Sequence, residues 1–339
     1  MTPGNNSTHC NPKDMPFEDS RQLLVVVYSI VFAVGIPTNC LTAALTLIQI
    51  GRDNIPAIYL FALSVCELLY VSTIPLWIKY VQNGHVWTMG LLPCKVTGYI
   101  FFCNIYISIL LLCCISIDRY VAVVYALESR GMRSQRIAVV VTIVLFGVIA
   151  VIHSPVFFTD IQDKNITTCF ETPYTRRVAI YSVVRFFVGF FVPFLILIFM
   201  NYKIFQSIKT SCSLTPPQKT KVKLLTISII AIFVICFAPY HFVLLIRSVH
   251  TLLHPGASCS FERSIYTVNV VFLCLSTANS MADPFIYVLA SENARREISR
   301  AFRALRMQWP NSSQTDSGKV KNSPRSLEEN RTLGNTGDR

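Results

Sequence analysis

The chain has 339 residues, of which 53% are hydrophobic and only 14% are charged, and its mean hydropathy is +0.50. A soluble domain of this length has too little interior to bury so much apolar surface, so the composition excludes an ordinary soluble protein and indicates a membrane protein. The formal net charge of +12 could suit nucleic acid, but the basic residues cluster beside apolar segments, which favours membrane lipids as partners. We expect no nucleic-acid partner.

Seven segments are long and apolar enough to cross a bilayer, since a spanning helix needs roughly 20 mostly apolar residues. In chain order they are residues 23–50, 55–81, 96–125, 137–158, 180–208, 224–249 and 265–290. Prolines within them indicate kinks in a packed bundle, notably Pro193, Pro239 and Pro284. The predicted fold class is an all-α membrane protein with one domain, a seven-transmembrane helix bundle over residues 23–290.

The segments outside the bundle carry different patterns. Residues 1–22 are polar and lack the features of a signal peptide, so we expect the first span to direct insertion. Residues 291–306 place apolar residues at helical spacing among arginines, which predicts a short amphipathic eighth helix on the inner lipid surface. Residues 307–339 are polar and predict a disordered cytoplasmic tail with candidate phosphorylation sites.

Lysine and arginine are enriched in the short segments that follow the first, third, fifth and seventh spans, which predicts that these segments are cytoplasmic and the N-terminus extracellular. Three asparagine sequons then fall on the outer side, where a glycan can be attached: Asn5, Asn6 and Asn165. Four of the 12 cysteines also lie at or beyond this oxidising face, where three pairings are open: Cys10, Cys94, Cys169 and Cys259.

Four short motifs place polar residues or prolines within the spans, where polar groups are costly in lipid and so indicate either function or bundle packing. The third span ends in IDRY (117–120) and the seventh contains DPFIY (283–287). The sixth contains CFAP (236–239) and the first contains GIPTN (35–39). Each motif is weak alone, but their order along seven spans is specific.

With these motifs the chain resembles the rhodopsin-like (class A) G-protein-coupled receptors. Within that class it is similar to the proton-sensing and lysolipid receptor subfamily through CKVTGYIFFCNIYISILLLCCISIDRYVAVVYALESRG from Cys94, FAPYHFVLL from Phe237 and VVFLCLSTANSMADPFIYVLA from Val270. The resemblance implies a multi-pass receptor of the plasma membrane, not an enzyme. Its implied partners are a heterotrimeric G protein, arrestin and receptor kinases. It also implies that Cys94 pairs with Cys169 and that Cys10 pairs with Cys259.

By this resemblance six residues form the switch toward the G protein: Asp118, Arg119, Tyr120, Asp283, Pro284 and Tyr287. Arg119 is expected to stay beside Asp118 at rest, and the alternative is an arginine that snorkels to the interface. Many relatives hold this arginine with an acid at the foot of the sixth helix, where this chain has Lys219-Thr220-Lys221, and Asn201 replaces a common tyrosine. Because like charges repel, we hypothesise a weakly held resting state with basal signalling.

The family also places seven polar residues around a sodium ion inside the bundle: Asn39, Glu67, Asn104, Ser108, Asn279, Ser280 and Asp283. Two neighbouring carboxylates in a low dielectric should share a cation or a proton and titrate as a pair. The alternative is a satisfied polar network without a sensing role. Proton-sensing relatives add a buried acid in the fourth span, and residues 137–152 contain none. Apart from this ion we expect no metal and no cofactor.

Arg185 is a cation within the fifth span, where an anionic partner would stabilise it. It could bind a carboxylate or phosphate through paired hydrogen bonds. The family layout surrounds it with a ligand pocket that includes Tyr99, Phe101, Phe102, Arg185, Phe237 and His241, with Tyr106 and Phe186 nearby. The alternative is an ion pair with Glu171 of an outer loop. Phe101 stands where amine receptors carry an aspartate, so a cationic amine ligand is not expected.

The leading interpretation is a receptor for a lipid-like acid, of the oxidised fatty acid or lysophospholipid class, that is modulated by pH. The alternative is a receptor whose primary agonist is the proton, which the Glu67 and Asp283 pair favours. A membrane transporter is a distant alternative, because the two halves of the chain show no repeat. An intramembrane hydrolase would need a nucleophile and a base at matching depth, and the motifs explain the acids better.

Overall fold

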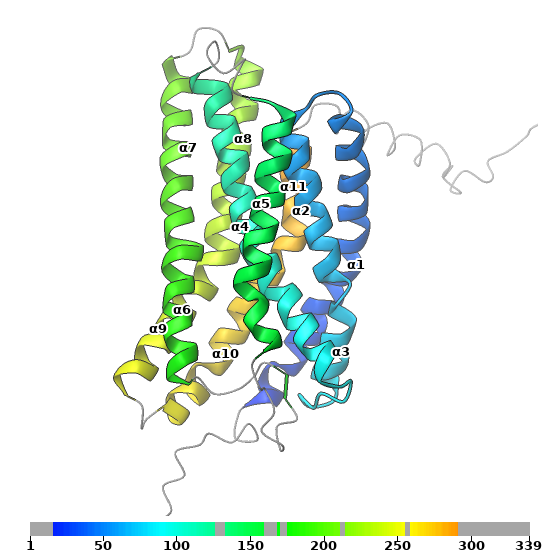
Figure 1. The fold of residues 1–339 in the computed structure, drawn as a ribbon, viewed down its shortest axis with the longest axis vertical. Coiled ribbons are helices and arrows are strands. Elements are labelled where there is room, and N and C mark those ends of the chain that lie inside the picture. The colour runs from blue at the N-terminus through cyan, green and yellow to red at the C-terminus, as the bar shows by residue number, and fades with distance from the viewer. Residues whose placement is uncertain are drawn as a thin grey trace, which may run out of the picture. The chain divides into compact units, whose positions relative to one another are not determined.

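The computed structural model describes residues 16–125, 133–158, 168–169, 175–210, 214–254 and 258–290. Residues 1–295 form one compact unit and residues 296–339 a second, which contains no described residue. Within the described ranges of the first unit the regular structure is entirely helical, and the helices run side by side (Figure 1). The predicted eighth helix and tail lie outside the described residues.

Seven helical stretches in the described ranges are long and apolar enough to span a membrane, which confirms the predicted fold class. The first span is α1 (Phe17–Ile50), the second is α2 (Ile55–Val71) with α3 (Ile74–Gln82), and the third is α4 (Leu91–Val124). The fourth is α5 (Gln135–His153) with η3 (Ser154–Phe157), and the fifth is α6 (Arg176–Phe186) with η4 (Phe187–Phe191) and α7 (Val192–Thr210). The sixth is α8 (Pro216–Ile232) with η5 (Phe233–Phe237) and α9 (Ala238–Leu253), and the seventh is α10 (Ser258–Thr277) with α11 (Asn279–Ala290).

The helix boundaries differ from the predicted spans at several points. The first helix begins at Phe17 rather than at residue 23. The second span is interrupted between α2 and α3, which the sequence analysis did not predict, and Pro75 then lies in the first turn of α3, where a missing N–H is tolerated. Hydrogen-bonding side chains mark two other starts: Ser134 accepts from the backbone N–H of Ile137, and Thr175 from that of Val178.

Two of the three predicted proline irregularities are present as wide π-helical turns. η4 ends just before Pro193, and η5 ends just before Pro239. Because proline has no backbone N–H and its ring crowds the preceding turn, a widened turn lets the helix continue past it. Pro284 instead lies inside the continuous helix α11, and the seventh span is interrupted earlier, at Ala278.

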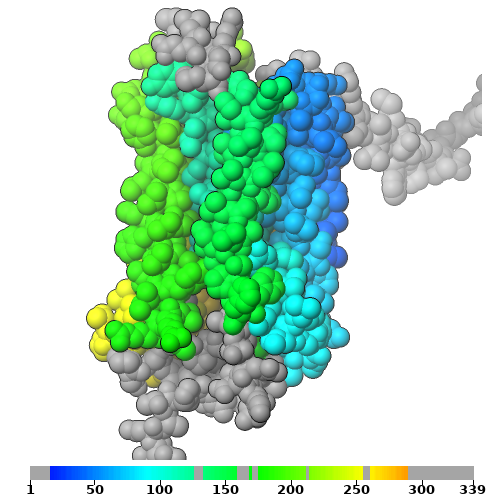
Figure 2. Space-filling model, in the orientation of Figure 1, coloured from blue at the N-terminus to red at the C-terminus, as the bar shows by residue number. Residues whose placement is uncertain are grey.

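The helices bury one side and present apolar side chains outward. In lipid every backbone polar group must bond within its own segment, which is why these apolar stretches form helices. α4 is more enclosed than most of the other spans and packs against α2, α5, α7 and α8. α5 lies at the outer surface in green in Figure 2, and its Ile143 and Val151 are 65% and 72% exposed. Such a face suits contact with lipid chains rather than water.

A disulfide joins Cys94, in the first turn of α4, to Cys169, and it confirms the predicted pair. Both cysteines are buried, and the backbone N–H of Cys169 donates to the hydroxyl of Tyr80 on α3. The link therefore ties a loop to the ends of the second and third spans. The predicted Cys10–Cys259 bridge and the three glycosylation sequons fall outside the residues whose side chains are described.

Candidate functional site

Five buried polar side chains meet inside the bundle, and we call them the Glu67 cluster: Glu67, Ser108, Asn279, Ser280 and Asp283. The Glu67 carboxylate accepts hydrogen bonds from Ser108 at 2.7 Å and from Asn279 at 3.1 Å. Its other oxygen accepts from Ser280 at 2.5 Å. The Asn279 amide also donates to Asp283 at 3.4 Å, so a single side chain bridges the two carboxylates.

The other two residues predicted for this site lie beside the cluster. Asn39 donates to the backbone carbonyl of Ser280 at 2.8 Å, and Asn104 donates to the thiol of Cys66. Three buried oxygens here make no hydrogen bond with any described residue: Oδ1 of Asn39, Asn279 and Asp283. Oxygen ligands of this kind suit a hard cation, and the pair of carboxylates equally suits a shared proton.

The carboxylate of Asp118, near the C-terminal end of α4, has a partner that the sequence analysis missed. Arg133, just before α5, donates three hydrogen bonds to it at 2.8, 2.9 and 3.0 Å. Arg119 lies farther away, with its Nε 3.7 Å from Asp118, and that Nε makes no hydrogen bond with any described residue. In this conformation Asp118 is therefore held mainly by Arg133, and only weakly by Arg119.

The remaining switch residues occupy two places near this end of the bundle. Tyr120 donates to the hydroxyl of Tyr125 at 3.3 Å. Tyr287 is buried on α11, and its hydroxyl accepts from Gln49 of α1 at 2.8 Å. Asn201 on α7 is buried, and neither polar atom of its amide has a hydrogen-bond partner among the described residues.

Arg185, in the last turn of α6, lies among aromatic rings. Its Nε donates to the hydroxyl of Tyr106 on α4 at 3.0 Å. Its guanidinium carbon lies 4.5 Å from the ring centroid of Phe102, 5.2 Å from that of Tyr106 and 5.6 Å from that of Tyr181. Ring faces stabilise a desolvated cation. The alternative partner, Glu171, lies outside the described residues.

Two histidines flank Tyr106 from opposite helices. The His153 ring on α5 stacks on it at 5.2 Å, and the His241 ring on α9 meets it edge-on at 5.8 Å. Nδ1 of His241 donates to the backbone carbonyl of Phe237 at 2.7 Å. Nε2 of each histidine is buried and makes no hydrogen bond with any described residue. The sequence had not assigned His153 to the pocket.

The predicted pocket residues do not all lie together. Phe102 and His241 gather with Arg185 around Tyr106. Tyr99 instead donates to a backbone carbonyl of α5 at 3.0 Å. Phe101 packs beside Phe102 but also against Tyr70 of α2, at ring distances of 5.3 and 5.7 Å. A helix places successive residues on different faces, so one stretch of α4 contacts α2, α5 and α6.

Close packing holds Tyr106 in place. A Cβ atom at Gly189, in the π-helical turn η4, would collide with its ring. The absence of a side chain there lets the fifth span approach α4 closely. The glycine thereby sets the position of the hydroxyl that Arg185 contacts, a role that no sequence motif signals.

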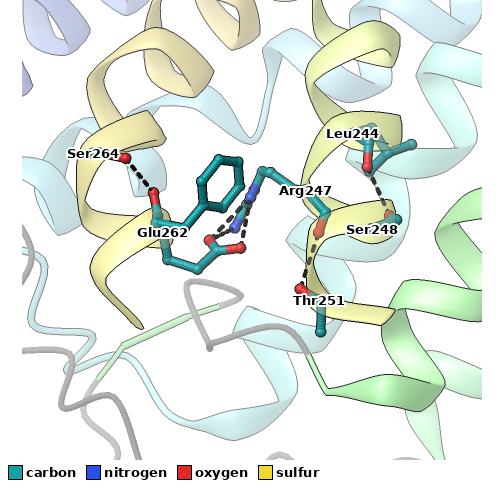
Figure 3. Close-up of polar contacts among 7 residues, drawn as sticks. Leu244, Arg247, Ser248, Thr251, Glu262 and Ser264 are labelled. Atoms are coloured by element: carbon teal, nitrogen blue, oxygen red, sulfur yellow. Dashed lines mark hydrogen bonds and ion pairs between the residues drawn. The ribbon is translucent and has the colours of Figure 1, made fainter. Parts of the chain in front are cut away.

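A second buried ion pair joins the sixth and seventh spans. Arg247 on α9 contacts both carboxylate oxygens of Glu262 on α10, at 2.5 to 3.3 Å (Figure 3). The Glu262 side chain is 3% exposed and that of Arg247 is 16% exposed. The hydroxyl of Thr251 donates to the Arg247 backbone carbonyl, which stiffens the same turn. No sequence motif predicted this pair.

A family model described as seven-transmembrane receptor (rhodopsin family) matches residues 38–287. The chain belongs to this family. The family predicted from the motifs is therefore confirmed, and it is a family of receptors rather than of enzymes or transporters. This rhodopsin-family receptor carries its seven spans, its Asp118-Arg119-Tyr120 motif and its buried polar cluster within or at the edges of the matched region.

The receptor is 52% identical over 301 residues to "Probable G-protein coupled receptor 132" of Homo sapiens, which covers 88% of this chain and 78% of that protein. It is 33% identical over 307 residues to "G-protein coupled receptor 68" of Homo sapiens, and the match covers 88% of this chain and 81% of that protein. It is 32% identical over 289 residues to "Lysophosphatidic acid receptor 4" of Homo sapiens, and the match covers 80% of this chain and 75% of that protein. The last name specifies a lysolipid ligand for that relative.

Proposed function

We propose that this receptor lies in the plasma membrane with its N-terminus outside, binds a lipid-like acid and activates a heterotrimeric G protein. The agonist class is an oxidised fatty acid or a lysophospholipid, and extracellular pH modulates the response. Arrestin and receptor kinases act on the active form from the cytoplasmic side. The family supports the receptor role and the multi-pass topology, and the basic residues after alternate spans support the orientation.

The observation that carries the proposed ligand class is the position of Arg185. Its guanidinium lies inside a spanning bundle, beside the Tyr106 hydroxyl and against the rings of Phe102 and Tyr106, and a charged side chain within a span indicates a functional site. A carboxylate or phosphate could form charge-assisted hydrogen bonds with its guanidinium. The His153 and His241 rings, whose buried Nε2 atoms make no hydrogen bond with any described residue, pack against the ring of Tyr106. Aromatic walls would take the apolar chain of the ligand.

The test measures second-messenger output from cells that express the receptor, with an oxidised fatty acid and a lysophosphatidic acid as agonists. Arg185→Gln removes the charge, and a hydrogen bond to a charged group contributes about 1.5–3 kcal/mol. The half-effective concentration should therefore rise by about ten- to hundredfold. Arg177→Gln is the matched control, because this arginine is exposed at the start of the same helix. Equal potency of the two variants would contradict the proposal.

A receptor whose primary agonist is the proton remains the second candidate, and the Glu67 cluster favours it. Two carboxylates bridged by Asn279 form a site where one added proton changes the charge of the bundle interior. The absence of any acid within α5 weighs against a proton receptor, because the fourth span offers no third acidic residue beside Glu67 and Asp283. An acid-driven response between about pH 6 and 8, present without lipid and lost in Glu67→Gln, would favour this candidate.

A sodium ion would fit the same cluster. Of the three buried oxygens without a hydrogen-bond partner among the described residues, one belongs to the Asp283 carboxylate and one to Asn279, which bridges Asp283 and Glu67. The third belongs to Asn39, whose amide donates to the Ser280 carbonyl. Residues that would hold the ion are Asp283, Asn279 and Asn39, with Glu67 as counter-charge. The ion would supply positive charge that holds the seventh span against the first two, and a proton at Asp283 would replace it. Competition between sodium and acid in agonist assays tests this assignment.

A further inference from the structure

The seventh span consists of two helical segments that meet at a turn. α10 ends at Thr277, α11 begins at Asn279, and the turn between them lies at Ala278. α11 packs against α1, α2 and α8, so it contacts both the first two spans and the sixth. Residues at the ends of elements are where hinge motions are usually absorbed. α11 is therefore a short segment that can pivot at Ala278 when its contacts release it.

Buried hydrogen bonds hold the end of α11 that lies next to this turn. Pro284 has no backbone N–H to donate to the carbonyl of Ser280 four residues earlier. Asn39 of α1 donates to that carbonyl instead, at 2.8 Å. The hydroxyl of Ser280 and the amide of Asn279 both donate to Glu67 of α2. The first two spans thus hold this end of α11 at the Glu67 cluster.

A separate hydrogen bond holds the far end of α11. The side-chain amide of Gln49, in the last turn of α1, donates to the hydroxyl of Tyr287 at 2.8 Å. Gln49 and Tyr287 are both buried, at 6% and 1% exposed. Tyr287 lies beyond Ser280 by roughly 10 Å along the helix axis. A contact far from the pivot restrains rotation of α11 more than a contact beside it, because the same rotation displaces the far end farther.

The side chain of Gln49 is oriented by its neighbours. The side-chain amide of Asn54, just before α2, donates to Oε1 of Gln49 at 2.7 Å, and the backbone N–H of Asn54 donates to the Gln49 carbonyl at 3.2 Å. An amide oxygen accepts and an amide nitrogen donates, so the Asn54 bond leaves the nitrogen of Gln49 facing Tyr287. Gln135 of α5 donates to the carbonyl of Ile50 at 2.7 Å and holds the end of α1.

We propose that Gln49 is a latch on α11, which holds Tyr287 against α1 and opposes the conformation that activates the G protein. This inference rests on the G-protein coupling proposed above, and Asn54 acts in it as a positioning residue. In this conformation the Tyr287 hydroxyl is engaged inside the fold, so a partner cannot contact it. Because α8 packs on α11, a change in the position of α11 also changes its contact with the sixth span. Release of Tyr287 therefore makes both the hydroxyl and the sixth span accessible to a partner at this end of the bundle.

The first arm of the test measures second-messenger output without agonist, at matched surface expression. Gln49→Met keeps the length of the side chain but removes its hydrogen bonds to Tyr287 and Asn54. A buried hydrogen bond shifts a two-state equilibrium by about two- to tenfold, so output should rise by that factor. Asn54→Ala should raise output less. Gln22→Met is the matched control, because Gln22 is exposed near the start of the same helix, and it should leave output unchanged.

A double-mutant cycle tests whether Gln49 acts through the hydroxyl of Tyr287. In the Tyr287→Phe background, Gln49→Met should change output by less than about twofold, since the bond is already absent. Equal rises in the two backgrounds would assign the effect to the packing of α1 and would overturn the latch. Output that is unchanged or lower in Gln49→Met would overturn it as well.

The second arm is independent of the G protein. Amide hydrogen exchange of the full-length receptor in nanodiscs, measured by mass spectrometry, should be faster over residues 283–288 in Gln49→Met than in the parent or in Gln22→Met. Unchanged exchange there would overturn the latch whatever the signalling result. A parent that gives no output with lipid or acid, beside faster exchange in Gln49→Met, would contradict the proposed function while supporting the hold of Gln49 on α11.

Discussion

Replacing Glu262 by glutamine should destabilise the contact between α9 of the sixth span and α10 of the seventh. The change keeps the shape of the side chain but removes the negative charge that Arg247 contacts at 2.5 to 3.3 Å (Figure 3). Because the pair is nearly enclosed, water compensates the remaining guanidinium poorly. The loss should therefore appear in the stability of the whole bundle, since α9 and α10 pack against each other there.

The magnitude follows from burial and distance. Unit charges about 4 Å apart attract by about 4 kcal/mol at an effective dielectric of about 20. Breaking a fully buried pair costs about 3–5 kcal/mol. Arg247 is 16% exposed, so water recovers part of this cost. We expect a loss of about 2–4 kcal/mol of unfolding free energy, which corresponds to a fall of about 3–6 °C in melting temperature for a chain of this length.

The assay is thermal unfolding of the purified receptor in one detergent, followed by fluorescence. Glu18→Gln is the matched control, because Glu18 pairs with Arg21 at 3.2 Å on the surface of α1, with side chains 72% and 40% exposed. A surface pair contributes about 0–1 kcal/mol, so this control should melt within about 2 °C of the parent. A second variant, Arg247→Met with Glu262→Leu, should regain much of the stability. Equal melting of Glu262→Gln and Glu18→Gln would refute the reasoning.

Two further changes test contacts elsewhere in the bundle. Arg133→Ala removes the three hydrogen bonds to Asp118, so that carboxylate should hold Arg119 more tightly and basal second-messenger output should fall at matched surface expression; unchanged or higher output would contradict this competition. Gly189→Ala places a methyl group against the Tyr106 ring, and overpacking of this kind costs about 1–3 kcal/mol. Its melting temperature and agonist potency should both fall, and a parent-like variant would show that the ring has room to move.

The sequence by itself determined that the chain spans a lipid bilayer, how many spans it has and which family it belongs to. Long apolar runs leave few alternatives to helices that satisfy their own backbone, so the spans in the described ranges agree with the predicted ones apart from their ends. Polar residues inside such runs are conspicuous, which is why Glu67 and Asp283 could be singled out before any contact was known. The bridge from Cys94 to Cys169 was also expected, but from the family resemblance rather than from spacing.

The tertiary structure decided which side chains meet. Arg133 rather than Arg119 is the main partner of Asp118, and Arg247 pairs with Glu262, because these contacts depend on how each helix is rotated and tilted against its neighbours. A sequence reports which residues share a helix face, but the meeting of two faces is set by packing over the whole bundle. For that reason the charges could be read from the chain, whereas their pairing could not.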